Sequence, residues 1–174
     1  MKKLSTKALV QVALLIALTI IFNNVLAIPA PIVRTLNLSF LPIAIIAMLY
    51  GPLYAGVAAA VADVLGFYIF PAGPWPFFPG FTLSMFVTGV LFGVFLYNGR
   101  SLLRIVLAVV SVTVVVRMGL NILWLSMMWG DAFLVLFPPR VAGALLMVPI
   151  QVGLIRLVAS QRFYAIFGQK ATAS

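Results

Sequence analysis

Residues 73–93 read GPWPFFPGFTLSMFVTGVLFG, and this stretch decides the fold because it joins a loop to a membrane helix. Prolines lack a backbone donor and push the preceding residue towards an extended conformation, so the first half cannot be helical. Prolines and aromatic residues are interleaved there as Pro74, Trp75, Pro76, Phe77, Phe78 and Pro79. After Gly80 the sequence becomes apolar and helical, and Gly89 and Gly93 stand one turn apart. That spacing predicts a helix face on which another helix packs closely.

The composition of the whole chain places it in the membrane. Of its 174 residues 65% are hydrophobic and 7% charged, and the mean hydropathy is +1.26. These values lie outside the range of soluble domains and predict one all-α integral membrane domain over residues 1–174. Cysteine and histidine are absent, and the acidic residues are Asp63 and Asp131. A membrane enzyme is disfavoured, because catalytic groups, a metal site and a cofactor site would lack their usual side chains.

Hydropathy predicts six transmembrane helices. Their approximate ranges are 8–27, 35–50, 53–69, 81–97, 103–127 and 138–160. The first apolar run has about 20 residues, enough to span the bilayer, so we interpret it as a retained helix and not a cleaved signal. The second range is short of a full span if it begins at Ser39, since Ser39 to Tyr50 would reach only about 18 Å at about 1.5 Å per residue. It must begin near Thr35 or fall short of a full span.

The distribution of basic residues sets the predicted topology. With six spans, eight basic residues lie on the cytoplasmic side and Arg34 alone in an outer loop, which is a clear positive-inside pattern. The eight are Lys2, Lys3, Lys7, Arg100, Arg104, Arg156, Arg162 and Lys170. Both termini are therefore predicted to be cytoplasmic. Because these residues stand at helix ends and not on one polar face, their placement fits the topology of a chain in the lipid bilayer better than nucleic-acid binding.

Several polar residues are predicted in the outer half of the membrane. Arg34 lies in the first outer loop, Arg117 and Asn121 are one turn apart on the fifth helix, and Arg140 is near the outer end of the sixth. An intramembrane arginine is costly unless it is paired. The missing negative charge can come from lipid headgroups or from an anionic ligand, and for Arg117 pairing with Asp63 is a third explanation.

A ligand suited to these residues has a flat aromatic part and an anionic part. The aromatic side chains of the 74–81 loop offer stacking faces, and the Asn121 amide can donate and accept at the edge of a heterocycle. Arginines bind carboxylates in bidentate fashion. A channel or facilitator is the rival function, but it would need a polar path through both halves of the membrane. The inner half here is mostly Leu, Val and Ala.

Six short motifs in one order resemble a known family. They are LNLSFLPI (36–43), YGP (50–52), AxxADxxG (59–66), FPGFT (78–82), RMGLN (117–121) and VPIQ (148–151). Over about residues 13–157 the chain resembles a folate-specific S component, the substrate-binding membrane subunit of an energy-coupling-factor (ECF) vitamin transporter. The resemblance implies high-affinity folate binding at the outer face of the bacterial plasma membrane. An S component for another vitamin, such as riboflavin, is the alternative.

The resemblance also implies partners and site residues. The partners would be a shared transmembrane coupling subunit and two cytoplasmic ATPase subunits, and the chain itself has no GxxxxGK[ST] phosphate-binding motif. The residues expected to bind folate are Arg34, Asn37, Trp75, Phe77, Phe81, Arg117, Asn121 and Arg140. The glutamate end of the ligand is expected to point towards the outer mouth, because two carboxylates are costly to bury.

Ala13 and Ala17 are small residues four apart on the first helix. Such a pair lets another helix approach closely, either within this chain or from a partner. In S components an AxxxA pattern on the first helix is the docking face for the coupling subunit. The resemblance therefore favours a partner contact at Ala13 and Ala17.

Overall fold

The computed structural model describes residues 5–24, 38–70, 76–129 and 133–160, with the backbone alone at 129, 133–140, 142 and 144–146. The described residues contain helices and no strands. The helices are α1 (Thr6–Asn24), α2 (Phe40–Tyr50), α3 (Pro52–Ile69), α4 (Pro79–Leu96), α5 (Leu102–Ser111), the π-helix η1 (Val112–Leu120), α6 (Asn121–Trp129) and α7 (Phe133–Val158). Because α5, η1 and α6 follow one another without a break, these residues form six helical segments.

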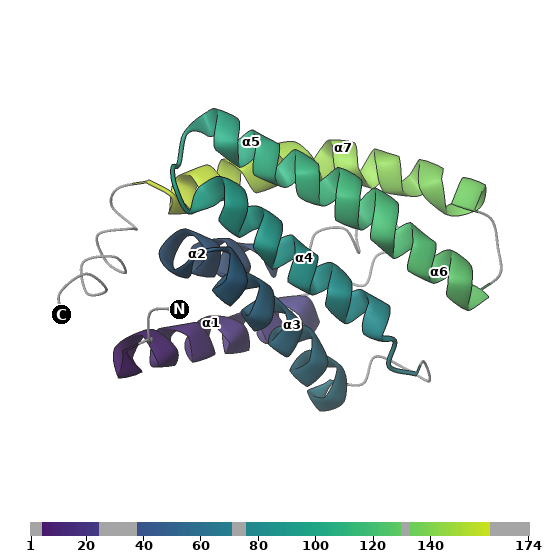
Figure 1. Cartoon of the computed structure of the whole chain (residues 1–174). Helices are drawn as coiled ribbons and strands as arrows, with labels where there is room; N and C mark the ends of the chain where they lie inside the picture. Colours follow the sequence, from purple (N-terminus) through teal and green to yellow (C-terminus); the bar gives the residue numbers. More distant parts are fainter. Residues whose placement is uncertain (1–4, 25–37, 71–75, 130–132, 161–174) are drawn as a thin grey trace.

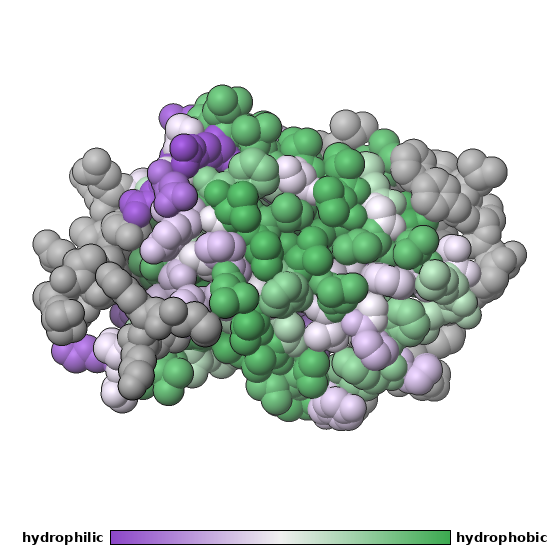
Figure 2. Space-filling model, viewed as in Figure 1, coloured by the Kyte–Doolittle hydropathy of each residue, from purple (hydrophilic) through white to green (hydrophobic). Residues whose placement is uncertain are grey.

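The helices pack as a bundle with α4 at its centre (Figure 1). The continuous α5–η1–α6 helix pairs with α7 on one side of α4, while α1, α2 and α3 lie on the other. Within the described residues four segments are long and apolar enough to cross a bilayer. They are Thr6–Asn24, Pro52–Ile69, Pro79–Leu96 and Leu102–Met128. Apolar residues cover most of the face shown in Figure 2, as expected for a surface in contact with lipid.

The second predicted helix is shorter than the range 35–50. Leu38 and Ser39 form a turn, and α2 begins at Phe40. The prediction of a helix at these two positions was wrong, and the shorter alternative holds. With 11 residues, α2 reaches only about 16 Å. It ends where Gly51, at φ 88°, turns the chain into α3.

The last predicted helix, 138–160, was wrong at its start. Helix α7 begins at Phe133, so Pro138 and Pro139 lie inside it and do not precede it. These prolines deprive the carbonyls of Leu134 and Val135 of their usual donors. Membrane helices tolerate such breaks because neighbouring groups satisfy the freed carbonyls. The proline signal therefore placed the boundary one turn too late.

Helices α3 and α4 pack at the closest distance that glycine permits. A Cβ atom built on Gly89 would lie 2.3 Å from the Ala55 carbonyl oxygen, and one on Gly93 would lie 2.1 Å from the Pro52 Cα. Real Cβ atoms do not approach backbone so closely, so only glycine fits at either position. The predicted close-packing face of residues 89–93 is confirmed, and α3 is its partner.

The core lies towards the end of the bundle that contains Gly51. Its buried residues come from all sides of α4, including Ile43 and Ile46 of α2, Phe92 and Leu96 of α4, Ile105 and Val109 of α5, and Ile155 of α7. A hydrogen bond of 2.5 Å from the Tyr50 hydroxyl to the Gln11 side-chain oxygen joins α2 to α1 near the same end. The tight core holds the helices in register, while the polar and aromatic groups gather at the opposite end.

Candidate ligand-binding site

Two side-chain hydrogen bonds join the helices at the end of the bundle that carries residues 76–78, here called the loop end. The Thr82 hydroxyl of α4 donates to the Asp63 carboxylate of α3 at 2.7 Å. The Trp124 indole N–H of α6 donates to the Ser84 hydroxyl oxygen of α4 at 3.1 Å. The carboxylate that the sequence placed inside the membrane therefore has a polar partner on α4, as a buried charged group requires.

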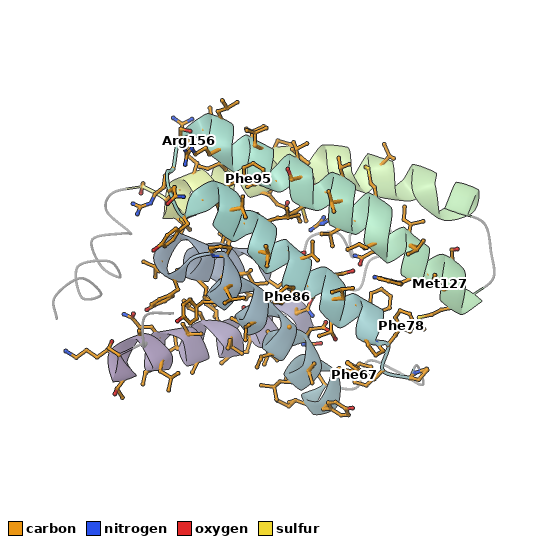
Figure 3. All side chains as sticks on the ribbon, viewed as in Figure 1. Phe67, Phe78, Phe86, Phe95, Met127 and Arg156 are labelled. Atoms are coloured by element: carbon orange, nitrogen blue, oxygen red, sulfur yellow. The ribbon has the colours of Figure 1, made fainter. Side chains whose placement is uncertain are left out.

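The loop residues Phe77 and Phe78 pack in different directions. Phe77 stacks on Tyr68 with ring centroids 5.9 Å apart and meets Phe67 edge-on at 5.3 Å. Phe78 lies 5.8 Å from both Phe81 and Trp124. Figure 3 shows Phe67 and Phe78 at this end, with Phe78 near the end of α6. The loop therefore connects α3 to α6 through Phe77, which packs on Phe67 and Tyr68, and Phe78, which packs on Trp124.

Gly80 explains how the loop comes so close to α6. A Cβ atom at this position would lie 2.7 Å from the Trp124 ring and 2.3 Å from the Phe78 ring. Both rings are held by the contacts described above, so a side chain at Gly80 would have to displace one of them. Pro79 is the first residue of α4, where a missing N–H costs nothing. The PG pair in FPGFT therefore starts the helix and seats the loop against Trp124.

Asn121 carries a buried polar atom that the described residues leave unsatisfied. Its side-chain oxygen has no hydrogen-bond partner among the described residues. Asn121 and Trp124 are three residues apart on α6, so their side chains share a face of the helix. A buried acceptor without a donor costs about 1–3 kcal/mol. A ligand that presents an N–H beside the Trp124 ring would remove this cost.

The helix that carries Arg117 and Asn121 has π geometry before Asn121. The Asn121 backbone N–H bonds to the Val116 carbonyl, five residues earlier. A π-helix has more residues per turn than an α-helix, so Arg117 and Asn121 are less than one full turn apart. The helix predicted over 103–127 is continuous in the structure, but residues 112–120 have π and not α geometry.

Thr113 lies near the start of the π segment and bonds to the preceding turn. Its hydroxyl donates to the Val109 carbonyl at 2.8 Å, and the Val112 N–H also bonds to that carbonyl. In an α-helix this carbonyl would accept the Thr113 N–H. Thr19 and Thr88 make the same kind of bond inside α-helices, so the Thr113 bond does not impose π geometry by itself. Short π segments are frequent at functional sites.

Half of the residues expected to bind the ligand are described with their side chains. Phe81 and Asn121 lie on the sides of α4 and α6 that meet around Trp124, Phe77 packs on α3, and Arg117 is half-buried in η1. Arg34, Asn37 and Trp75 lie outside the described residues. Arg140 falls in α7, where only the backbone is described. The roles of all eight in binding stay predictions.

Sequence reasoning missed the residues that hold the loop end together. They are Phe67, Tyr68, Thr82, Ser84 and Trp124. Of these five, Trp124 could have been found from the sequence. It follows Asn121 by three residues on an apolar helix, and its indole N–H needs an acceptor. The acceptor lies 40 residues away in sequence, which no local pattern reveals.

Ala13 and Ala17 are both exposed on α1. The residues of α1 that face its neighbours are Ala8, Leu15, Thr19 and Ile20. The alanine pair therefore does not pack against another helix of this chain. Its contact is with lipid or with a partner helix.

The fold and the loop end together define a class: a multi-pass helical membrane protein with a candidate small-molecule site at one end of its bundle. The chain belongs to the substrate-specific components of ECF transporters, because the model of that family matches residues 7–159. It is accordingly a multi-pass protein of the bacterial cell membrane. The resemblance seen in the sequence motifs is confirmed, and the family is one of transport subunits.

Curated relatives and a solved structure narrow the comparison. The chain is 44% identical over 151 residues to the folate transporter FolT of Clostridium novyi, with 86% of this chain and 85% of the relative covered. It is 34% identical over 159 residues to FolT of Leuconostoc mesenteroides, covering 87% and 84%. A crystal structure of FolT bound with folic acid matches with a TM-score of 0.80 and 33% identity, over 91% of this chain and 95% of the other.

Proposed function

We propose that this chain binds folate at the outer face of the membrane and is the substrate-capture subunit of an ECF-type vitamin importer. The observation that carries the proposal is the match to FolT bound with folic acid over 91% of the chain, at 33% identity. The two curated relatives are also named as folate transporters.

The geometry of the loop end supports a folate in particular. Folates combine a pterin, a benzoyl ring and a glutamate with two carboxylates. The pterin edge offers N–H donors to the buried Asn121 oxygen, and the rings of Trp124, Phe78 and Phe81 offer stacking faces beside it. The glutamate would then extend towards the outer mouth, where Arg34 is expected. Riboflavin lacks the carboxylates, and thiamine is a cation.

Titration of the purified chain tests the ligand assignment. We expect folic acid to bind the solitary chain in detergent or nanodiscs, and riboflavin and thiamine to bind far more weakly. Calorimetry, or quenching of the three tryptophans, reports the affinity. The absence of folic acid binding, or tighter binding of either other vitamin, would remove the folate assignment.

Arg34→Ala, titrated at low and high salt, tests the ligand orientation. A loss of about 1 kcal/mol or less that shrinks with salt supports an exposed carboxylate contact. A larger, salt-independent loss would reverse the proposed orientation.

The topology is part of the same proposal: six membrane helices in one domain, with both termini cytoplasmic. The start of α1, the α4–α5 turn and the end of α7 carry Lys7, Arg100, Arg104 and Arg156, at the end opposite to the loop end. A positive-inside arrangement then places the loop end outside. Cysteines at Ser5, Thr35 and Ser174 test this with an impermeant reagent on intact cells. Labelling at 35 alone is expected, and labelling at 5 or 174 would contradict it.

The partners belong to this proposal as well: a shared transmembrane coupling subunit and two cytoplasmic ATPases. Membership of the ECF family supports them. Co-purification of the three subunits with this chain is the expected result, and uptake of labelled folic acid should need all of them.

A further inference from the structure

The end of the bundle opposite to the loop end, here called the basic end, has a strong imbalance of charge. Lys7, Arg100, Arg104 and Arg156 lie there, and the one acidic side chain that the structure describes, Asp63, lies at the loop end. Figure 2 shows the most hydrophilic residues gathered at this end, directly beside a hydrophobic surface. The folate proposal assigns no role to this surface.

Arg104 and Arg156 come from different helices but lie at the same level of the bundle. Their sequence neighbours Ile105 and Ile155 are both fully buried and belong to the same core cluster. Helices α5 and α7 are in contact along this stretch and run in opposite directions. Since the isoleucines fix the register, the two exposed arginines lie at the same level of the bundle, where α5 begins and α7 ends.

Arg104 has a defined place on this surface. A Cβ atom at Gly99 would lie 2.9 Å from a guanidinium nitrogen of Arg104, so the side chain lies back over the turn between α4 and α5. The Ser101 hydroxyl caps α5 by accepting from the Arg104 backbone N–H at 3.4 Å. The guanidinium therefore lies near the first turn of α5, whose positive dipole end also favours an anion.

Exposed leucines stand directly beside the two arginines. Leu103 is 69% exposed and Leu157 is 61% exposed, and each is adjacent in sequence to one of the arginines. Leu102 and Leu107 add further exposed apolar surface on α5. A soluble acidic partner would neutralise the arginines but leave these leucines uncovered. A lipid matches both features, because its phosphate can meet the guanidinium groups while its acyl chains cover the leucines.

We propose that Arg104 and Arg156, with Leu103 and Leu157, form a binding site for an anionic phospholipid at the basic end of the bundle. The headgroup phosphate lies between the two guanidinium groups, and the acyl chains run along α5 and α7. The site would prefer anionic over zwitterionic lipid and fix the depth of these helices in the bilayer. It does not depend on the folate assignment.

Native mass spectrometry of the full chain tests the site. The chain is incubated with equal amounts of phosphatidylglycerol and phosphatidylcholine that carry identical acyl chains. We expect the wild type to retain mainly phosphatidylglycerol. Arg104→Gln and Arg156→Gln should each lower the ratio of bound phosphatidylglycerol to phosphatidylcholine about fivefold, and raised salt should reduce the preference.

Lys7→Gln is the matched control, because it removes one charge at the same end but on α1. It should leave the lipid ratio unchanged, and all variants should keep the wild-type thermal midpoint. If Lys7→Gln lowers the ratio of bound phosphatidylglycerol to phosphatidylcholine as much as the arginine variants do, the preference comes from the overall positive charge of this end, and the site is overturned. Binding of millimolar inorganic phosphate to the chain in the absence of lipid, lost in the two arginine variants, would assign the site to a free anion and overturn the lipid site. Unchanged lipid ratios together with lost binding of the ATPase subunits would make it a protein interface, and would also overturn the proposal.

Discussion

Asn121 is the residue whose surroundings bear most directly on a ligand. Its side-chain oxygen is buried without a partner among the described residues, on the face of α6 that also carries Trp124. We expect Asn121→Ala to weaken folic acid binding about 5- to 150-fold, since a buried polar contact with a heterocycle edge is worth about 1–3 kcal/mol. Titration of the purified variant measures this.

The control for this prediction is Leu123→Ala. Leu123 lies on the same helix but is 45% exposed, so its truncation should change the affinity by less than about twofold. If both variants bind folic acid as the wild type does, Asn121 has no part in the site. If both lose binding, the effect comes from the helix and not from the amide.

The sequence predicts residues such as Asn121 better than it predicts their neighbours. Asn121 and Arg117 stand out because amide and guanidinium groups are rare in an apolar run, and Asp63 stands out in the same way. Trp124 and Ser84 do not stand out, since tryptophan and serine are ordinary residues in membrane helices. Their hydrogen bond depends on how α4 and α6 pack, which the sequence pattern of neither helix contains.

At the scale of elements, the contact between α3 and α4 is the firmest constraint. Gly89→Ala would place a methyl group on the Ala55 backbone, which cannot yield as a flexible side chain can. We expect a loss of about 1–3 kcal/mol in the free energy of unfolding, as for other overpacked sites. Reversible unfolding of the purified variants in mixed micelles gives the value.

Gly153→Ala provides a matched comparison on α7. A Cβ atom there would have nothing within 4 Å, so the substitution should be neutral or stabilise the helix by up to about 1 kcal/mol. If Gly89→Ala and Gly153→Ala destabilise the protein equally, the close approach of α3 and α4 does not depend on glycine at position 89. The spacing of Gly89 and Gly93 predicted such a face correctly, but α3 as its partner became visible only in the structure.

The π segment is the element that the sequence did not predict. Residues 112–120 are mostly apolar, so hydropathy does not mark the deviation. We infer that the bond from Thr113 to the Val109 carbonyl near the start of the segment favours it. Valine at position 113 keeps the shape but removes the hydroxyl. Thr113→Val should allow a return to α geometry, rotate Asn121 by part of a turn, and weaken folic acid binding at least about fivefold, the worth of one hydrogen bond.

Thr113→Ser separates the hydroxyl from the buried methyl group of Thr113. It should keep the π segment and bind folic acid within about twofold of the wild type, at some cost in stability from the lost methyl group. Backbone amide spectra of the two variants should differ around residues 112–121. Wild-type affinity in Thr113→Val would show that the hydroxyl does not set the geometry of the site.

At the scale of the whole molecule, the two ends of the bundle have different chemistry. The loop end holds the aromatic contacts, Asp63 and Asn121, and the basic end holds the exposed arginines next to the tight core. Charge counting along the sequence predicted this separation, because helix ends alternate between the two sides of the membrane. Helix α1 lies at the edge of the bundle, with one face turned outward.

Ala13 and Ala17 lie on that outward face, and their role as a docking site for the coupling subunit can be tested by size. Replacing either with tryptophan adds bulk where this chain makes no contact, so folding and folic acid binding by the solitary subunit should stay within about twofold of the wild type. Uptake of labelled folic acid in cells that contain the coupling subunit and both ATPases should be lost, because a bulky side chain prevents close approach of a partner helix.

Val94→Trp places the same side chain on an exposed position of α4 and should leave uptake intact if α1 alone docks. Overpacking of an internal contact would instead cost about 1–3 kcal/mol and weaken binding and uptake together. Loss of binding in step with uptake would therefore contradict a partner face, as would normal uptake by both alanine variants. If uptake fails in the Ala13 and Ala17 variants and not in Val94→Trp, the defect lies in the contact between α1 and a partner subunit. The same added bulk at an exposed position of α4 would then have no effect.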